Sequence, residues 1–237
     1  MSNSLPTATQ LAALTKLDTP TICNALEIAS PERRGYGYTV KPLVACFPEL
    51  PPMVGYARTA TCRAMRPISL DKAVVRKKRF EYFDYLASGG PLPAISVVQD
   101  LDGPNAGFGA FWGEVQTNIH KSLGCLGTIT DGSVRDIPMM ASEFQVLAGS
   151  IGPSHAFTHL VEFGTDVVIH GMHVASGDLI HADRHGAAII PLNVVQKVLD
   201  AADLLARREA VILDVCKAPG FTVAKLKQAI GAADEIH

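Results

Sequence analysis

The stretch GEVQTNIHKSLGCLGTITDGSVRD, from Gly113 to Asp136, decides the fold. Its first part, from Glu114 to Ser122, follows a glycine-rich loop and predicts a helix. Leu126 to Thr130 is a short apolar run with β-branched residues, which predicts a strand that Asp131-Gly132 closes. We expect another helix to begin near Arg135-Asp136. A strand before the glycine-rich loop completes the order strand, loop, helix, strand, which is typical of a parallel crossover.

The same alternation continues on both sides of this stretch. Thr19-Pro20 and Ser69 predict helix starts, the second helix ending near Ala87 before Gly89-Gly90. Strands are expected over four short apolar runs: Pro93 to Gln99, Val167 to Ile169, Asp178 to His181 and Ala187 to Ile190. A long C-terminal helix is expected from Leu192 to about Lys217, with a break at Pro219-Gly220 and a short terminal helix. Residues 1–237 are therefore predicted to form a single α/β domain with helical ends.

Composition excludes several classes of protein. The 237 residues contain 21 Lys and Arg and 23 Asp and Glu, so the formal charge is −2, which argues against a nucleic-acid binder. No run approaches the length of a membrane span. The five cysteines are scattered without a C-x-x-C pair, which argues against a disulfide framework or a zinc ribbon. With no visible signal peptide, the sequence predicts a cytoplasmic protein whose sparse surface charge (19% charged residues) favours burial between subunits.

The candidate site lies at the two ends of the central stretch. Glu114 opens a predicted helix, and Arg135-Asp136 follow the next strand, so a parallel crossover brings them to the carboxyl ends of adjacent strands. Backbone N–H groups from Gly113 through Gln116 would add an anion site. Two carboxylates suit Mg²⁺ or Mn²⁺, and an Arg fork suits a carboxylate, so this set would bind a metal chelated by a small 2-oxo acid. The alternative interpretation is a capping Asp beside a surface Arg.

The stretch resembles the RraA-like family, which includes the 4-hydroxy-4-methyl-2-oxoglutarate aldolases. Aldolases of that family carry an acid, twenty residues and then Arg-Asp, as Glu114 and Arg135-Asp136 do here. Further similar segments are Thr21 to Glu27, Gly55 to Thr61 and Ser176 to Pro191, so the resemblance covers nearly the whole chain. It implies a swivelling ββα-type α/β sandwich with a mixed sheet and a long C-terminal helix, assembled as homotrimers or homohexamers.

The resemblance also implies roles for individual residues. Asp136 would hold a divalent metal, Mg²⁺ or Mn²⁺, and Glu114 would orient metal-bound water. Arg135 and the backbone of Gly113, Glu114, Val115 and Gln116 would bind the pyruvyl part of the substrate. Glu209, on the long C-terminal helix, would reach the site of a neighbouring subunit.

These roles imply a metal-assisted retro-aldol cleavage through a pyruvate enolate, with Arg135 stabilising the developing charge. The same enolate forms when oxaloacetate loses CO₂, so decarboxylation is expected as well. Two alternatives stay open. One is a non-catalytic regulator of a ribonuclease, like the namesake of the family, and the other is a diverged metal-dependent enzyme on another substrate.

Six of the eight histidines fall between His155 and His185, where the chain departs from the family pattern. His181, Asp183 and His185 alternate, as residues on one face of a strand do, and His155 and His159 have i, i+4 spacing. Local hydrogen bonding is the ordinary interpretation of histidines at hairpins and glycine turns. The alternatives are a His/Asp transition-metal site, binding of the distal part of the substrate, or a subunit contact. Met139 and Asn24 also stand where many members of the family carry an acid.

Overall fold

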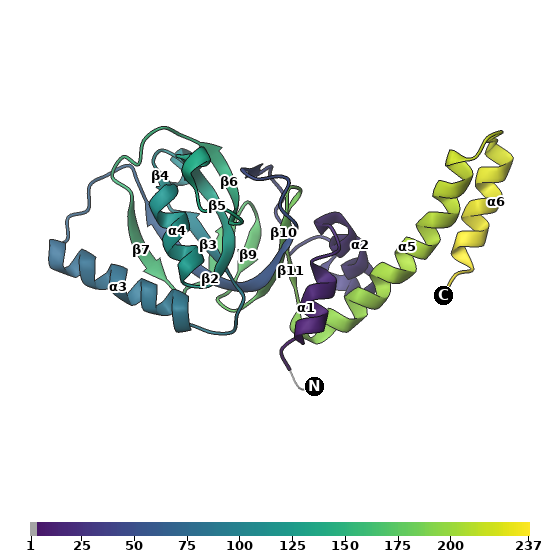
Figure 1. The fold of residues 1–237 in the computed structure, drawn as a ribbon, viewed down its shortest axis with the longest axis horizontal. Helices are drawn as coiled ribbons and strands as arrows, with labels where there is room; N and C mark the ends of the chain where they lie inside the picture. The colour runs from purple at the N-terminus through teal and green to yellow at the C-terminus, as the bar shows by residue number, and fades with distance from the viewer. Residues whose placement is uncertain (1–3) are drawn as a thin grey trace.

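The structure, a computed structural model, describes residues 4–237. A curled nine-stranded mixed sheet forms its body, and a helical hairpin projects from one side (Figure 1). The α-helices are α1 (Ala8–Leu14), α2 (Thr19–Ala29), α3 (Lys72–Ser88), α4 (Glu114–Ser122), α5 (Val195–Lys217) and α6 (Val223–Asp234). The strands are β1 (Val44–Ala45), β2 (Met53–Arg63), β3 (Ala94–Asp100), β4 (Ala110–Trp112), β5 (Cys125–Val134), β6 (Gln145–Ile151), β7 (His159–Phe163), β8 (Val167–Ile169), β9 (Met172–Val174), β10 (Leu179–Asp183) and β11 (Gly186–Ile190). The short 3₁₀ turns are Pro31–Arg33, Gly103–Asn105, Ile137–Met139 and Leu192–Val194.

The sheet is parallel in its centre and antiparallel at its edges. Its strands follow the order β1-β6-β5-β3-β2-β10-β11, with β4 paired to β5 and β7 paired to β2. The pairs β2–β3, β3–β5, β5–β6 and β4–β5 are parallel, whereas β1–β6, β2–β10, β10–β11 and β2–β7 are antiparallel. The parallel crossover predicted around the central stretch is therefore confirmed.

Three apolar clusters bury the sheet. The β8–β9 hairpin packs Ile169 and Met172 against central-strand residues such as Ile129. On the other face, the α3 and α4 side covers a second cluster that includes the fully buried Trp112. The third cluster joins α1, α2 and the first turns of α5 to β2, β10 and β11. Because strands of the parallel core are buried on both faces, ten of the eleven residues of β2 are buried.

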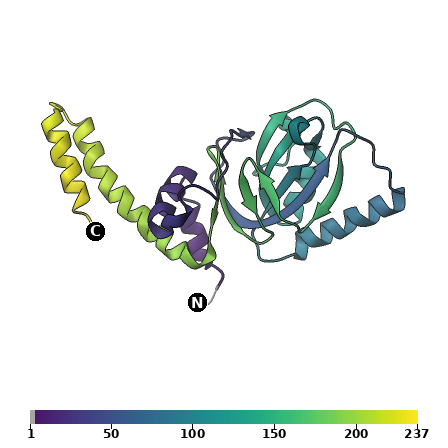
Figure 2. The ribbon, with the colours of Figure 1, turned by 180° about the vertical axis from the view of Figure 1, so that it is seen from behind.

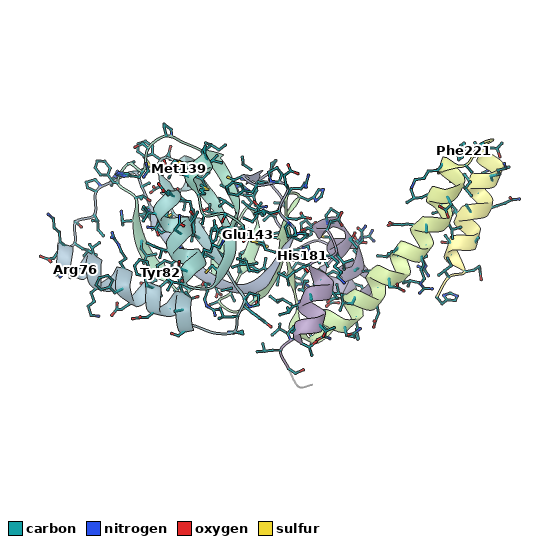
Figure 3. The ribbon with its side chains drawn as sticks, viewed as in Figure 1. Arg76, Tyr82, Met139, Glu143, His181 and Phe221 are labelled. Carbon is teal, nitrogen blue, oxygen red and sulfur yellow. The ribbon has the colours of Figure 1, made fainter. Side chains whose placement is uncertain are left out.

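The second half of α5 leaves the body and pairs with α6. Its buried residues, from Val195 to Ala202, all lie in the first eight positions of the helix. Arg208 Nη2 donates to the Ile236 carbonyl (2.8 Å), which ties the chain end back to α5. Both ribbon views show this hairpin standing clear of the sheet, and Phe221 lies at its tip (Figures 1, 2 and 3). None of the helices in residues 4–237 combines the length and apolarity needed to cross a membrane.

Two sequence expectations are wrong in detail. The helix expected at Arg135-Asp136 is absent. The chain forms only the 3₁₀ turn Ile137–Met139, because Met140 takes extended backbone angles (φ −63°, ψ 158°) and ends it. The strand expected to close at Asp131-Gly132 instead continues to Val134, with a register shift against β6 between Thr130 and Ser133.

Candidate active site

The β4–α4–β5 unit brings the predicted site residues together. Strand β4 ends at the buried Trp112, and the N–H of Arg135 donates to the Trp112 carbonyl (3.0 Å). Because β4 and β5 run parallel, Glu114 follows the carboxyl end of one strand and Arg135 that of its neighbour. The meeting of these residues, predicted from a spacing of twenty residues, is a direct consequence of this pairing.

The N-terminus of α4 is open. Gly113 is the cap residue and no side chain accepts a hydrogen bond there, while the first helical bond runs from Thr117 N–H to the Gly113 carbonyl (3.1 Å). The N–H groups of Glu114, Val115 and Gln116 therefore have no partner within the helix. Such a helix start attracts anions through its free donors and its dipole.

Gly113 also leaves room for Asp136. A Cβ atom at position 113 would lie 2.7 Å from Asp136 Oδ2, closer than such contacts occur. Asp136 itself has left-handed backbone angles (φ 57°, ψ 31°), a conformation that costs a non-glycine residue about 1–2 kcal/mol. Backbone strain of this kind is concentrated at functional sites, where it positions a side chain.

Arg135 and Asp136 are both partly open to solvent. Their side chains are 37% and 34% exposed, and Arg135 Nη1 lies 3.6 Å from Asp136 Oδ1. Neither the Arg135 guanidinium nor the Asp136 carboxylate is part of a buried ion pair, so both groups can contact a ligand. The capping interpretation of Asp136 is wrong, because its side chain accepts no capping hydrogen bond.

These side chains line one pocket of about 180 Å³. All of the pocket residues predicted from the sequence are present in its wall: Gly113, Glu114, Val115, Gln116, Arg135 and Asp136. Ala110, Phe111, His155 and Thr158 complete the lining. Sequence reasoning did not single out Thr158, although it lies in the segment where the chain departs from its apparent relatives.

A larger hollow of about 660 Å³ lies at the end of β2 and beside the 103–105 turn. Arg63, Arg66 and His159 line it together with Asp102. The Asp102 carboxylate already accepts hydrogen bonds from two backbone N–H groups and lies 3.4 Å from Arg63 Nη1. The larger hollow thus lacks the open carboxylates and the free helix start of the smaller pocket.

The donor set of the smaller pocket fits a hard divalent cation. Glu114 and Asp136 offer carboxylate oxygens, and Gly113 keeps the space beside Asp136 Oδ2 free of a side chain. No cluster of three or more His, Cys, Asp or Glu side chains suited to a metal occurs within residues 4–237. Mg²⁺ and Mn²⁺ are compatible with this geometry, because Mg²⁺ in particular keeps several waters and needs only one or two protein carboxylates.

Glu209 does not belong to this pocket within one chain. It is exposed on the second half of α5, in the hairpin that projects from the far side of the body (Figure 1). Its contribution to the site of a neighbouring subunit stays a prediction.

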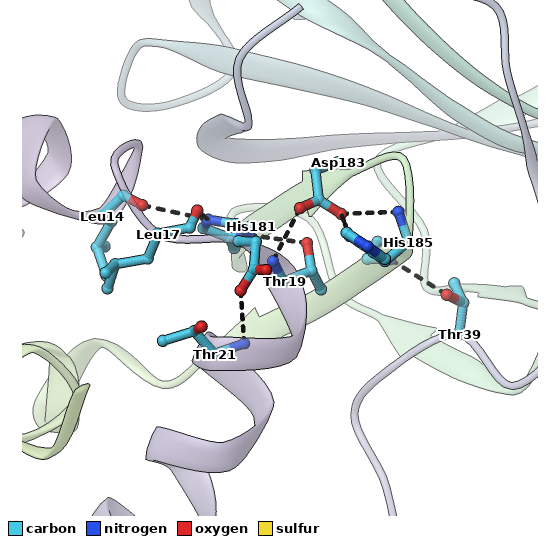
Figure 4. A network of polar contacts seen from close by, with 10 residues as sticks. Leu14, Leu17, Thr19, Thr21, Thr39, His181, Asp183 and His185 are labelled. Atoms are coloured by element: carbon cyan, nitrogen blue, oxygen red, sulfur yellow. Dashed lines mark hydrogen bonds and ion pairs between the residues drawn. The ribbon is translucent and has the colours of Figure 1, made fainter. Parts of the chain in front are cut away.

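Among the described residues, His181, Asp183 and His185 form no metal site, so that alternative interpretation is wrong. His181 Nε2 faces the carbonyl oxygens of Leu17 (3.0 Å) and Leu14 (3.2 Å), and its Nδ1 lies 3.0 Å from Thr19 Oγ1 (Figure 4). Nε2 therefore carries the proton, and Nδ1 accepts one from the threonine. Burial lowers the pKa of His181, which favours this neutral form.

Asp183 and His185 also make local hydrogen bonds instead of facing a metal. Asp183 Oδ2 accepts from the Thr19 N–H (2.9 Å), and its Oδ1 accepts from the His185 N–H (2.8 Å) and contacts His185 Nδ1 (3.1 Å) (Figure 4). Burial alone would raise the pKa of Asp183, but these hydrogen bonds lower it overall. His181 and Asp183 thus fasten the start of α2 to β10, and His185 lies beyond the end of the strand.

The other pair of histidines is also engaged locally. His155 Nδ1 bonds to the Ala156 carbonyl (2.7 Å), and His159 Nδ1 bonds to the Phe157 carbonyl (2.8 Å). Their i, i+4 spacing has no helical meaning, because His155 lies in a turn and His159 begins β7.

A row of buried hydrogen bonds links α4 to α3, and no sequence pattern indicated it. Tyr82 O–H lies 2.9 Å from His120 Nε2, and His120 Nδ1 donates to the Gln116 carbonyl (2.7 Å). Burial lowers the pKa of His120 to about 4, so the ring is neutral and its Nε2 accepts from the tyrosine. The first turn of α4 is thereby anchored to α3.

Comparison with known proteins agrees with this architecture. A protein from Pseudomonas syringae pv. tomato str. DC3000, described as uncharacterized, has a similar structure (TM-score 0.73, 21% identity, 98% of this chain and 97% of that chain). Streptomyces coelicolor RraAS2, described as an unusual member of the RNase ES inhibitor RraA protein family, is also similar (TM-score 0.67, 20% identity, 87% and 96%). A third similar structure is described among novel cellulases from gut-associated microbes (TM-score 0.71, 17% identity, 88% and 90%).

At these identities the likeness concerns the fold alone, and a search of curated proteins finds no match. The fold class expected from the sequence, a mixed α/β sandwich with a long C-terminal helix, is confirmed. The sequence pattern of the RraA-like family, described as Aldolase/RraA, matches residues 19–189. Because this match spans more than half of its length, the chain belongs to the RraA-like family, which includes both 4-hydroxy-4-methyl-2-oxoglutarate aldolases and RraA regulators.

Proposed function

We propose that this protein is a divalent-metal-dependent lyase that cleaves a 2-oxo acid through a pyruvate enolate. The observation that carries the proposal is the single small pocket in which Glu114, Arg135, Asp136 and the open N-terminus of α4 meet. Its reactions are aldol cleavage of a 4-hydroxy-2-oxo acid and decarboxylation of oxaloacetate.

The chain's own groups bind the pyruvyl half. The N–H groups at the start of α4 and the Arg135 guanidinium bind the carboxylate of the 2-oxo acid. Asp136 holds Mg²⁺ or Mn²⁺, and Glu114 contributes through a water molecule. When bound, the cation supplies Lewis acidity toward the 2-oxo group.

Cleavage then needs one proton acceptor and one stabiliser of negative charge. The carbon-4 hydroxyl gives its proton to a water that Glu114 positions, and the hydroxyl oxygen forms a carbonyl as the C3–C4 bond breaks. The electron pair of that bond enters the pyruvyl half as an enolate, whose charge Arg135 stabilises. Protonation at carbon 3 gives pyruvate. From oxaloacetate, CO₂ leaves and the same enolate forms.

A coupled assay for pyruvate tests the proposal. The full chain is stripped with EDTA and then supplied with Mg²⁺ or Mn²⁺ together with oxaloacetate or 4-hydroxy-4-methyl-2-oxoglutarate. We expect pyruvate to appear only when metal is restored. The proposal would be refuted if both substrates released pyruvate no faster with protein and metal together than without them.

We also propose assembly into a homotrimer or homohexamer in which Glu209 reaches a neighbouring site. The projecting hairpin supports this, because it exposes apolar side chains on both helices and their turn, at Leu213 (47%), Phe221 (46%), Val223 (63%) and Ile230 (43%). Sedimentation analysis measures the assembly. If Glu209 acts between subunits, mixing Glu209→Ala with Asp136→Ala protein restores a fraction of active sites, whereas a Glu209 inside its own site restores none.

A further inference from the structure

The larger hollow beside the 103–105 turn presents positive charge to solvent and almost no negative charge. Its wall contains Arg63, Arg66 and a single acidic residue, Asp102. The Arg63 side chain is 49% exposed, whereas the Asp102 side chain is only 5% exposed. A ligand that enters the hollow therefore meets guanidinium groups rather than a carboxylate.

Arg63 is held in place at the end of β2. Its Nη1 donates to the Leu101 carbonyl (2.9 Å) and lies 3.4 Å from Asp102 Oδ1, and both of these residues line the same hollow. Asp102 is fixed in turn by the N–H groups of Ala64 (2.7 Å) and Met65 (3.0 Å). Among residues 4–237, Nε and Nη2 of Arg63 have no hydrogen-bond partner. A guanidinium that is already oriented loses less conformational freedom when it binds a ligand.

Arg66 adds a second guanidinium, which has no partner in the described part of the chain. It is exposed in the segment between β2 and α3, and its side chain makes neither a hydrogen bond nor an ion pair with residues 4–237. His159 of β7 lies opposite Arg63 in the antiparallel β2–β7 pair, so both side chains are on the same face of the sheet. Three nitrogen-bearing side chains thus share one wall without an accessible acid among them.

This wall suits an oxyanion. The planar guanidinium presents paired N–H donors that match the oxygens of a phosphate or a carboxylate. A concave surface lined by one sign of charge also concentrates ions of the opposite sign. Ser69 and Asn105 add neutral hydrogen-bonding groups to the lining. The volume of about 660 Å³ is typical of sites that hold a whole small molecule.

We propose that the larger hollow is a second binding site, in which Arg63 and Arg66 bind the phosphate or carboxylate group of a small metabolite. The hollow shares no lining residue with the pocket of Glu114, Arg135 and Asp136. The inference therefore goes beyond the proposed lyase function and does not depend on it.

Calorimetric titration of the full chain tests this site, with inorganic phosphate and citrate as separate probes. The buffer is free of divalent cations, which citrate chelates, and low in salt, which screens exposed charges. Arg66→Gln removes one guanidinium at an exposed position, so the fold should persist. We expect Kd for the tighter probe to rise about tenfold or more, the effect of one lost charged hydrogen bond. Tighter binding of phosphate would identify a phosphorylated metabolite, and tighter binding of citrate a polycarboxylate.

Arg184→Gln is the matched control, because it removes the same charge from an exposed position outside the hollow. Its Kd should equal that of the wild type. The inference would be overturned if the wild type bound neither probe, or if Arg66→Gln bound as tightly as the wild type. Equal weakening by Arg184→Gln would also overturn it, because the effect would then come from net charge.

Steady-state kinetics separates the hollow from the candidate active site. Arg66→Gln should leave KM and kcat for pyruvate release from oxaloacetate unchanged. A raised KM would show that Arg66 belongs to the site of Glu114 and Asp136, and the second site would be disproved. If the wild type releases no pyruvate at all, the proposed lyase function fails, whereas the titration still decides the second site.

Discussion

The pocket at α4 and the histidine cluster at β10 are both groups of polar residues at strand ends, yet they differ in one respect. In the histidine cluster, the polar side chains are already bonded to the backbone. His181 contacts the Leu14 and Leu17 carbonyls, and Asp183 accepts from the Thr19 N–H. In the pocket, the helix start is uncapped, so its first N–H groups have no partner within the helix. Polar groups without hydrogen-bond partners therefore distinguish a candidate binding site from a structural cluster, although both groups of residues resemble functional sites in the sequence.

The largest expected effect is that of Asp136→Asn. Asparagine tolerates the left-handed backbone, so the fold should persist while the metal-holding carboxylate is lost. We expect kcat/KM for metal-dependent pyruvate release to fall about 10³-fold or more, the scale of removing a stabiliser of transition-state charge. Circular dichroism and thermal melting verify the fold. Full turnover in the variant would show that Asp136 has no role in catalysis.

Arg135→Lys should have a smaller effect on the same pocket. Lysine keeps the charge but loses the planar fork that matches a carboxylate. The expected loss in kcat/KM is roughly 10- to 100-fold, corresponding to about 1.5–3 kcal/mol for a charged hydrogen bond. Steady-state kinetics with oxaloacetate measures it. Identical kinetics for Arg135→Lys and the wild type would mean that the guanidinium does not bind substrate.

His181→Ala should affect stability rather than chemistry. It leaves the partly buried Leu17 carbonyl without its donor, whereas the Leu14 carbonyl keeps the Leu17 N–H (3.1 Å). Together with the cavity left by the ring, this costs about 2–4 kcal/mol. Thermal melting should show a Tm lowered by roughly 5–15 °C. His173→Ala, which removes an exposed histidine of β9, is the matched control and should leave the Tm unchanged.

Activity per folded molecule distinguishes the two regions directly. If His181→Ala lowered kcat at temperatures where the protein is folded, the contrast between a structural cluster and a functional pocket would fail.

The smallest expected effect concerns Asp131, a partly buried carboxyl on the strand that leads to Arg135. Burial raises its pKa from 3.8 to about 6. Between these values the folded chain binds more protons than the unfolded chain, so this group lowers stability as pH rises through that window. Asp131→Asn keeps an acceptor for the Asp100 N–H (2.7 Å) and removes the charge. We expect a gain of about 1–2 kcal/mol at pH 7 and none below pH 3.8.

Chemical denaturation at several pH values measures this difference. Asp84→Asn, at an exposed position of α3, is the control. Parallel stability curves for Asp131→Asn and the wild type would show that the Asp131 charge does not destabilise the folded chain.

Local sequence predicted those elements whose ends carry strong signals. The bounds of α4 agree with the prediction, and β3, β8, β10 and β11 lie within one or two residues of the predicted runs. For α3, the cap is Asp71 rather than Ser69, because several polar residues near the helix start compete and packing selects among them. The end of β5 was missed, since its last residues are held by pairing with β4 and β6, partners distant from any local pattern.

The sequence by itself determined the parallel crossover and the meeting of Glu114 with Arg135 and Asp136. A fixed spacing between two strand ends is enough for that, because adjacent parallel strands place their carboxyl ends at one edge. Only the tertiary structure decided which polar residues are free to bind. Whether a histidine or threonine has a partner depends on backbone groups far away in the chain, such as the Leu14 carbonyl that occupies His181. Thr158 lines the pocket because its turn is held by distant backbone groups. The Phe157 N–H donates to the Ala64 carbonyl after β2, and the Ala110 N–H of β4 donates to the Ser154 carbonyl.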